Sequence, residues 1–434
     1  MDFEREELNK SRQEWEEEKA FRKKQMKMLK IGFAMMLTVI FSCCFVMMAA
    51  VKGWFPFASA PAETNPMIQT DPTQTEQTEP TEPTFPEDTV IHLVAGGDVN
   101  VTDRTVAAGL SEGSYDYQNL FMDLIPVLAG GDLTVLNVEG NLYGTPYGKN
   151  SAPQALAQAL ANAGVDILQT ANSRSIANGL TGLRATLDGI RQAGMEPVGT
   201  FTDKKEFEKT GGYIIREVDG VRIAFVAFTK GMDDLLSVPA GGENCVNLLY
   251  EDYYSTFQKV NKDGIKKVLG AVREEKPDLT VALLHWGSEY NDNISKTQKE
   301  ICKLMREEGV NAIIGTHPHY VQQMVYEEDT GFFTAYSLGD LVSDGDRAGT
   351  DYSVLLDLEI TKDGKTGTVR ITGFRYVPVY LFRQEDGSMR VLRIQEAVTA
   401  YESNYVGKIS DEVYQEMKTA LTRIEGRVKA KVPE

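Results

Sequence analysis

The chain has little cysteine for its 434 residues, and this shortage narrows the kinds of site it can hold. Of the four cysteines, Cys43 and Cys44 lie inside a long apolar run, which leaves only Cys245 and Cys302 elsewhere. Two cysteines are too few for a disulfide scaffold, and their spacing is not that of a cysteine metal site. One disulfide and two buried thiols are both open readings of this pair.

Basic residues are also in short supply. The chain has 45 Lys and Arg residues against 63 Asp and Glu residues, and its formal net charge is −18. A protein that binds nucleic acid needs a basic face, so the composition predicts no nucleic-acid partner. The apolar fraction of 42% is typical of a globular protein with a substantial core.

The one long uncharged apolar run, residues 31–51, has the length of a bilayer-spanning helix, about 20 residues. Five basic residues precede it, and Lys52 stands nearly alone after it. They are Arg22, Lys23, Lys24, Lys27 and Lys30. The positive-inside rule therefore predicts a single-pass protein of the cell membrane, with residues 1–30 as a charged cytoplasmic segment and the main domain extracellular.

A cleaved signal peptide is the alternative reading of this region, with the small residues 58–60 as the cleavage site. Residues 52–88 are rich in Thr, Pro and Glu and nearly free of large apolar side chains. Such a segment cannot bury enough surface to offset its chain entropy, so we expect a disordered linker.

From residue 89 onward, short apolar runs alternate with amphipathic helical patterns. Helices are predicted over 117–128, 153–163, 182–193, 250–275, 296–308 and 411–428. Turn signals of the hairpin type occur at 219–220, 328–331, 362–364 and 385–387. Alternating strand and helix followed by hairpins predicts a layered α/β fold with mixed sheets.

Three of the four histidines lie just after two of the predicted strands. His285 ends one apolar run, with Glu289 four residues later, and His317 and His319 follow the next run. Open α/β sheets place their sites at the carboxyl ends of strands, and imidazole is the commonest metal ligand. His92 lies near the start of the first strand, where a structural or surface role is expected.

Earlier predicted strands also end in polar side chains. These are Asp98, Asn137, Glu139, Asn172, Ser173 and Arg174. Carboxylate, carboxamide and imidazole groups meeting at one edge predict a hydrolytic site for a divalent metal. Oxygen and nitrogen donors suit Mn, Fe or Zn, and two such ions can hold both the attacking and the leaving oxygen.

Six short segments of this part occur in one order: AGGD at 95–98, LNVE at 136–139, Ala171-Asn172 with 179–186, HWGSEY at 285–290, GTHPHY at 315–320 and YSLGD at 336–340. Each alone is unspecific, but in this order they resemble the CapA (poly-γ-glutamate capsule synthesis) family, which is related to the calcineurin-like metallophosphoesterases. The resemblance implies a metallophosphoesterase-like sandwich over 89–344, with helices flanking two mixed sheets. The strands and helix of 345–434 are expected to pack on the same domain.

The resemblance also implies roles for individual residues. The implied metal ligands are Asp98, Glu139, Asn172, His285, His317 and His319. Catalysis is expected to involve His285, His317 and Arg174, and substrate binding Arg174 and Glu289. Trp286 and Tyr336 are expected to be packing residues, and Asp340 a turn residue.

Two positions depart from the family pattern. Arg174 stands where the family has the histidine of its Ala-Asn-Asn-His motif, and Thr316 stands where it has the first histidine of Gly-His-His-Pro-His. In the related phosphoesterases the histidine of the Ala-Asn-Asn-His motif, at the position of Arg174, helps to protonate the leaving group. Arginine keeps its proton and cannot replace that function, although it can hold a phosphate or carboxylate with two hydrogen bonds. Its fixed charge would also oppose a nearby metal ion.

Two functions are therefore open from the sequence. One is a membrane-anchored, metal-dependent hydrolase with a degenerate site, acting on a phosphoester or amide-type bond in the synthesis or export of poly-γ-glutamate or another anionic envelope polymer. The other is a non-catalytic subunit that binds the polymer or acts as a scaffold. In both, the expected partners are the polymer or its precursor, the membrane through residues 31–51, and polymer synthase subunits.

Overall fold

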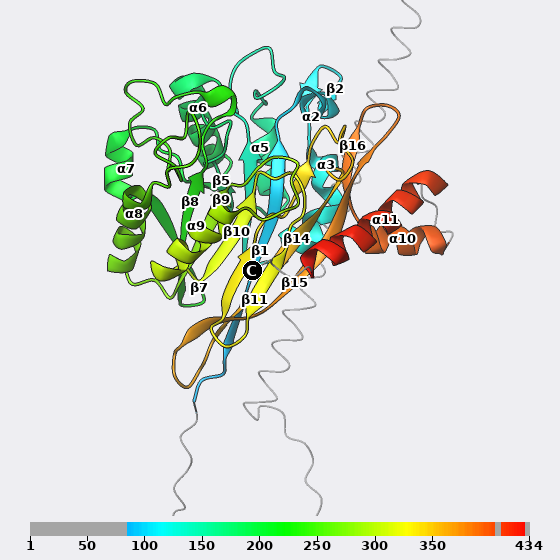
Figure 1. Cartoon of the computed structure of the whole chain (residues 1–434). Helices are drawn as coiled ribbons and strands as arrows, with labels where there is room; N and C mark the ends of the chain where they lie inside the picture. Colours follow the sequence, from blue (N-terminus) through cyan, green and yellow to red (C-terminus); the bar gives the residue numbers. More distant parts are fainter. Residues whose placement is uncertain (1–84, 404–408, 430–434) are drawn as a thin grey trace, which may run out of the picture. The chain divides into compact units, whose positions relative to one another are not determined.

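The computed structural model describes residues 85–403 and 409–429, shown as coloured ribbons in Figure 1. The predicted cytoplasmic segment, the apolar run 31–51 and the linker up to residue 84 lie outside this range. Within the described ranges, no helix combines the length and the apolar character needed to cross a bilayer.

Two mixed β-sheets form the framework of the domain. The first has the strand order β16 (Met389–Arg393), β15 (Val369–Arg383), β14 (Tyr352–Lys362), β1 (Thr89–Asn100), β4 (Leu133–Glu139), β5 (Ile167–Gln169) and β6 (Glu196–Val198), with β13 (Asp340–Val342) pairing with the end of β1. The second has the order β11 (Met324–Glu327), β12 (Phe332–Ala335), β10 (Ala312–Thr316), β9 (Leu279–His285), β8 (Val221–Thr229) and β7 (Tyr213–Val218). Strands β2 (Leu110–Ser111) and β3 (Ser114–Tyr115) form a separate small hairpin.

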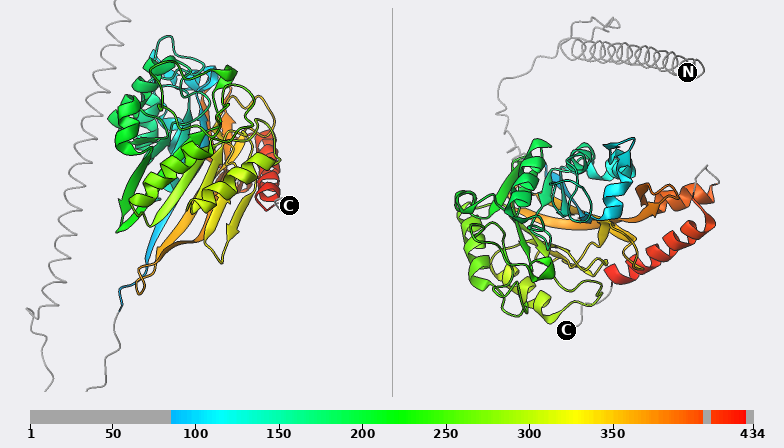
Figure 2. Two further views of the ribbon diagram at one scale, coloured as in Figure 1. Left: turned by 60° about the vertical axis from the view of Figure 1, so that its left-hand side comes forward. Right: turned by 90° about the horizontal axis from the view of Figure 1, so that it is seen from above.

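Helices lie outside these sheets and connect their strands. They are α2 (Asp103–Ala108), α3 (Gln118–Phe121), η1 (Met122–Leu124), α4 (Ile125–Leu128), α5 (Ala155–Asn162), α6 (Gly179–Gln192), α7 (Lys204–Thr210), η2 (Asp233–Leu235), α8 (Lys262–Glu274), α9 (Lys296–Glu307), α10 (Ile394–Glu402) and α11 (Asp411–Val428). Seen from above, the red α11 lies at the opposite end of the domain from the green α7 and α8 (Figure 2).

The core has three main apolar layers. One lies between the sheets and joins side chains of β1 and β14 to those of β8 and β9, such as Leu93, Leu356, Phe225 and Val281. A second packs α3 and α5 on the outer face of the first sheet, and a third packs α8 and α9 on the outer face of the second. The predicted α/β class with mixed sheets, flanked by helices, is confirmed.

All four predicted hairpin turns join consecutive antiparallel strands. They lie between β7 and β8, β11 and β12, β14 and β15, and β15 and β16. The predicted closing helix matches α11 at both ends. Cys245 and Cys302 are both free thiols, which excludes the disulfide, and of the two only Cys245 is fully buried.

Two predicted helices were wrong in extent. The segment 117–128 is broken into α3, η1 and α4, because Pro126 lacks the N–H that a continuous helix would donate to the carbonyl of Met122. The helix predicted from residue 250 starts only at Lys262. Before it, the Asp252 carboxylate accepts hydrogen bonds from the backbone N–H groups of Gln258 and Lys259 and closes a turn instead.

The end of β1 is irregular, and this irregularity places the first carboxylate of the site. The register with β4 shifts between Ala95 and Asp98, and the Asp98 N–H donates to the Gly339 carbonyl oxygen at 3.1 Å. A β-carbon on Gly97 would lie 1.8 Å from that same oxygen. Only glycine lets β1 and the segment before β13 approach so closely, which explains Gly97, the residue directly before Asp98.

Candidate metal centre

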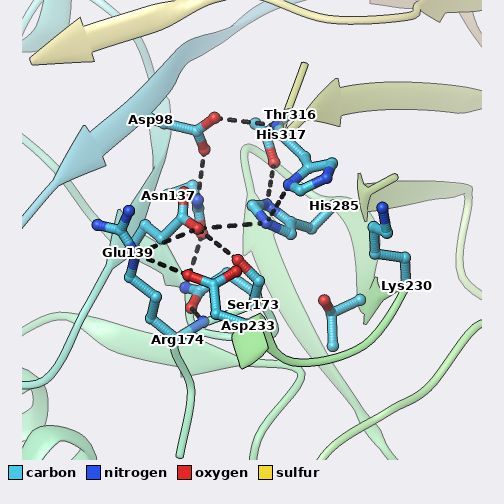
Figure 3. A network of polar contacts seen from close by, with 12 residues as sticks. Asp98, Asn137, Glu139, Ser173, Arg174, Lys230, Asp233, His285, Thr316 and His317 are labelled. Atoms are coloured by element: carbon cyan, nitrogen blue, oxygen red, sulfur yellow. Dashed lines mark hydrogen bonds and ion pairs between the residues drawn. The ribbon is translucent and has the colours of Figure 1, made fainter. Parts of the chain in front are cut away.

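Polar side chains from both sheets meet where their parallel strands end (Figure 3). Asp98 and Glu139 come from β1 and β4, His285 from the end of β9, and His317 and His319 from the turn after β10. All five side chains are buried. The convergence expected from the sequence is therefore present in the fold.

Glu139, His285 and His317 form one group whose donor atoms lie within 4.8 Å of one another. His285 Nε2 is 3.1 Å from His317 Nδ1 and 3.6 Å from Glu139 Oε1. Glu139 Oε2 and His317 Nε2 are buried and have no hydrogen-bond partner. Buried polar atoms are normally paired, so these two atoms fit a bound cation.

Asp98, His319 and Asp340 form a second group with the same spread of donor atoms. His319 Nδ1 lies 2.8 Å from Asp340 Oδ1. Burial opposes the charge on His319, but the neighbouring Asp340 carboxylate outweighs it and raises the imidazole pKa to about 10. Burial raises the Asp340 pKa to about 6, so at neutral pH the two form an ion pair. A metal ion here would take the place of the proton on His319.

The pKa values of the carboxylates of Asp98 and Glu139 are shifted in opposite directions. Burial, together with the charge of Glu139, raises the pKa of Asp98. Burial would also raise the pKa of Glu139, but His285 and Arg174 hold it well below its ordinary value. Burial and the neighbouring His285 lower the pKa of His317, which therefore stays neutral, the form that binds metal.

Arg174 lies against the first group, and 15% of its side chain is exposed. Its Nε is 3.2 Å from Asp233 Oδ2 and 3.8 Å from Glu139 Oε1. Its guanidinium therefore faces two carboxylates of its own chain, and the positive charge is held in the centre. Coulomb repulsion weakens cation binding at Glu139 relative to a centre with a neutral side chain at this position.

Asn172 and Ser173 support this arrangement by hydrogen bonds within the chain. The Asn172 amide donates to the Val138 carbonyl at 2.7 Å and to Asn137 Oδ1 at 3.2 Å. Its side-chain oxygen accepts from the Arg174 N–H at 3.1 Å. The Ser173 hydroxyl donates to Glu139 Oε1 at 2.6 Å. Asn172 thus lies beside the centre, and its role as a metal ligand stays a prediction.

Two other residues considered on the basis of the sequence, Glu289 and His92, lie outside the two groups of metal donors. Glu289 is exposed on the loop after β9, and its substrate-binding role stays a prediction. His92 bonds to Asp357 at 2.9 Å on the outer part of β1, in keeping with a structural role.

Sequence reasoning missed Asp340 as a member of the centre. Expected as a turn residue, it instead begins β13, is 3% exposed and faces His319. The signal was present, because Asp340 ends the last of the six ordered segments. Asp233 was also missed, since it lies in the irregular η2 rather than at a strand end.

The backbone of the histidine turn is strained. His317 and His319 have φ values of 93° and 62°, in the left-handed region that side chains other than glycine rarely adopt. Asp98 Oδ2 accepts the His317 N–H at 3.0 Å and helps to hold this conformation. Strain of this kind is typical of positions whose side chains are placed for a function.

A protein-family comparison relates the chain to known sequences. The family model described as bacterial capsule synthesis protein PGA_cap matches residues 92–345, more than half of the chain. The capsule biosynthesis protein CapA of Bacillus anthracis is 28% identical over 218 residues, 49% of either chain. The PGA biosynthesis protein CapA of Bacillus subtilis (strain 168) is 25% identical over 249 residues, which are 56% of this chain and 60% of that protein. The chain thus matches about half to three fifths of these relatives' length.

Solved structures show a weaker likeness. The calcineurin-like phosphoesterase YfkN from Bacillus subtilis has 14% identity and a TM-score of 0.39, with 78% of this chain and 98% of that chain covered. A phosphatase from Mycoplasma pneumoniae has 14% identity and a TM-score of 0.40, with 67% and 94% covered. Likeness at this level says nothing about reaction or substrate.

Proposed function

This chain belongs to the bacterial capsule synthesis family PGA_cap, and on that premise we propose that it is a membrane-anchored, extracytoplasmic hydrolase that uses a divalent metal in the synthesis or export of an anionic envelope polymer. The names of its relatives point to a capsule polymer and, for one of them, to PGA. The apolar run 31–51, with basic residues before it, supports the anchor and the extracellular position of the domain.

One observation carries the metal-dependent part of this proposal. Two buried groups of carboxylate and imidazole donors lie side by side, and in one of them Glu139 Oε2 and His317 Nε2 are without partners. Leaving such atoms buried and unpaired costs about 1–3 kcal/mol each. A Mn, Fe or Zn ion suits this mixture of donors and would relieve that cost.

A divalent ion held by these residues would supply Lewis acidity and activate a water molecule for attack on a phosphoester or amide-type bond. The protein supplies the rest. Arg174 provides a fixed positive charge that can hold an anionic group of the substrate, and Asp340 orients the imidazole of His319. Since Arg174 cannot release a proton, the leaving group is protonated less efficiently than in a family member with histidine at this position.

A non-catalytic role in polymer binding is the second candidate, and Arg174 is the observation that favours it. A partly buried arginine at the position of the expected imidazole opposes metal binding and favours an anion. In that case the centre grips a carboxylate-rich or phosphate-rich chain without cleaving it.

An assay of substrate turnover distinguishes the hydrolase from the polymer-binding protein. Detergent-solubilised full-length protein, supplied with Mn²⁺, is assayed against p-nitrophenyl phosphate, bis(p-nitrophenyl) phosphate and γ-glutamyl-p-nitroanilide. We expect metal-dependent release of p-nitrophenol or p-nitroaniline from at least one of them. Asp98→Asn should abolish this release, whereas Asp329→Asn, in an exposed turn, serves as the matched control. No turnover of any probe by metal-loaded protein would favour the binding role.

Arg174→His restores the imidazole that the family pattern has at this position. General acid catalysis typically contributes 10²–10⁴-fold, so we expect a rise in kcat of at least about 10-fold in the metal-loaded protein. Removing the guanidinium charge should also strengthen metal binding. Steady-state kinetics and a metal titration measure the two effects, and Arg174→Gln, which removes the charge without adding an acid, separates them. An unchanged kcat in Arg174→His with full metal occupancy would contradict this account of Arg174.

A further inference from the structure

A cavity of about 390 Å³ opens beside the metal centre, and most of the residues that line it lie outside the two groups of metal donors. Its floor includes Arg174, His319 and Asp340, while its outer wall is the loop 343–350 that follows β13. A volume of this size is in the range of small-ligand pockets, so it can take one or two units of a polymer. The features of its wall indicate what kind of group it takes.

Arg347 supplies a second positive charge at the mouth of this cavity. Its guanidinium carbon lies 3.8 Å from the centre of the Tyr290 ring, and the Tyr290 ring stacks on His319 at 4.8 Å and 20°. Arg347, Tyr290 and His319 thus form a continuous stack from the rim to the metal centre. Among the residues that the structure describes, no carboxylate lies within ion-pair distance of Arg347.

Both sides of this stack are held in place by the backbone. The Tyr290 N–H donates to the Pro318 carbonyl at 3.0 Å, and Tyr290 has a φ of 55°. On the loop, the Ser343 hydroxyl donates to the Thr350 carbonyl at 2.8 Å, and Thr350 donates to the Arg347 carbonyl through both its N–H and its hydroxyl. These bonds fix the backbone of the loop that carries Arg347, so less of the chain has to be ordered when a ligand binds, which lowers the entropic cost of binding.

Acidic side chains also line the cavity, and two of the three are paired with basic side chains. Asp346 pairs with Arg104, and Asp340 pairs with His319. Asp344 Oδ1 and Asn100 Oδ1 line the same cavity, are buried, and have no hydrogen-bond partner. Unpaired acceptors of this kind call for N–H or O–H donors on the ligand.

We propose that this cavity is a substrate subsite in which Arg347, stacked on Tyr290, binds an anionic group next to the bond held at the metal centre, while Asn100 and Asp344 accept hydrogen bonds from N–H or O–H groups of the same chain. The inference rests on the proposed function and deepens it by assigning residues outside the metal centre to substrate binding. The ligand that fits them is a repeating chain with an anionic group beside a hydrogen-bond donor. On a protein with a net charge of −18, the guanidinium of Arg347 supplies a local positive charge that attracts a polyanion.

Two polymers share this chemistry, namely a carboxylate-bearing polyamide and a phosphate-bearing polyol. The test is equilibrium binding by calorimetry, with full-length protein in detergent and two probes, a γ-linked glutamate tetramer and a glycerol phosphate oligomer. We expect one of them to bind, and the preferred probe identifies the source of the anionic group. Arg347→Gln should raise its Kd about 10-fold, as expected for loss of a charge-assisted contact.

Three further variants make the result specific. Arg370→Gln removes the same charge from an exposed position on β15 and should leave Kd unchanged. Tyr290→Phe keeps the stacking ring and should stay within about 2-fold of the wild type, whereas Tyr290→Ala frees the guanidinium and should weaken binding as Arg347→Gln does.

An Arg347→Gln protein that binds the preferred probe with the wild-type Kd would overturn the proposal, and so would a wild-type protein that binds neither probe. Because binding is measured without turnover, the subsite and the hydrolase fail separately. Probe binding that depends on Arg347, without cleavage of any substrate, supports the subsite and removes the hydrolase. Cleavage with no effect of Arg347→Gln on Kd removes the subsite and leaves the hydrolase.

Discussion

Replacing His317 with alanine is expected to lower the affinity of the centre for Mn²⁺ or Zn²⁺ by at least about 100-fold, because even groups that only support a metal ligand contribute 10–100-fold. His317 Nε2 is buried and unpaired, and the imidazole is kept neutral by burial and by the neighbouring His285. It is therefore ready to bind metal without first losing a proton. A fluorescent-chelator competition titration on the full-length protein measures the change.

Two comparisons guard this result against a folding effect. His317 has a left-handed φ of 93°, where alanine is less well tolerated, so circular dichroism should accompany the titration. His285→Ala, at the end of the regular strand β9, should lower the affinity to a similar degree without that complication. His92→Ala removes an imidazole that bonds to Asp357 and should leave the affinity unchanged. Equal affinities in all four proteins would remove His317 and His285 from the ligand set.

Trp286→Ala is expected to lower the free energy of unfolding by about 3–5 kcal/mol, the usual cost of removing a buried tryptophan. Trp286 is fully buried and packs in the core beneath the second sheet. It stacks on Tyr336 with ring centres 5.8 Å apart, and its indole N–H donates to the Tyr336 carbonyl at 2.9 Å. The alanine variant loses the contact area and leaves that carbonyl without its donor.

Urea unfolding followed by far-UV circular dichroism measures this effect, since the variant lacks one of the three tryptophans that fluorescence would report. Trp286→Phe keeps the ring packing and should lose a smaller part of the stability. A Trp286→Ala protein of wild-type stability but reduced probe binding would place Trp286 at the substrate surface instead of in the core.

Local sequence signals predicted much of the fold because they act over a few residues. A two-residue hairpin turn of type I′ requires positive φ at both central residues, and Asp-Gly adopts this readily, so the pair between two strand patterns located the turn at Asp219 and Gly220. The amphipathic pattern likewise predicted α11, and the structure shows that the Ser410 side chain caps its first turn. Pro126 was also a local signal, and the prediction of one continuous helix over 117–128 left it out.

The centre was only partly predictable, because its members come from distant strands. Histidines at the ends of two parallel neighbours, β9 and β10, had to meet at one edge, and they do. Asp340 joins them only because β13 pairs with the irregular end of β1, which no periodicity reveals. The partner of Arg174 was out of reach for the same reason, since Asp233 lies in a loop whose path depends on the folded sheet.

The stack of Arg347, Tyr290 and His319 was even less predictable from the sequence than the metal centre. Tyr290 and Arg347 lie in loops after two different strands, β9 and β13, that belong to different sheets. Tyr290 ends the segment HWGSEY at 285–290, but nothing in the sequence relates it to Arg347. Only the packing of the two sheets brings a tyrosine face, a guanidinium and a candidate metal ligand into one column.

The central claim is that the buried carboxylates and imidazoles hold a divalent metal, and its most direct test is the metal content of the protein. Full-length protein is purified in detergent without chelator, dialysed, and analysed by inductively coupled plasma mass spectrometry for Mn, Fe and Zn, before and after reconstitution with each ion. We predict at least one equivalent of metal per chain, held through dialysis. Less than a tenth of an equivalent of every metal after reconstitution would contradict the claim and leave the polymer-binding role in its place.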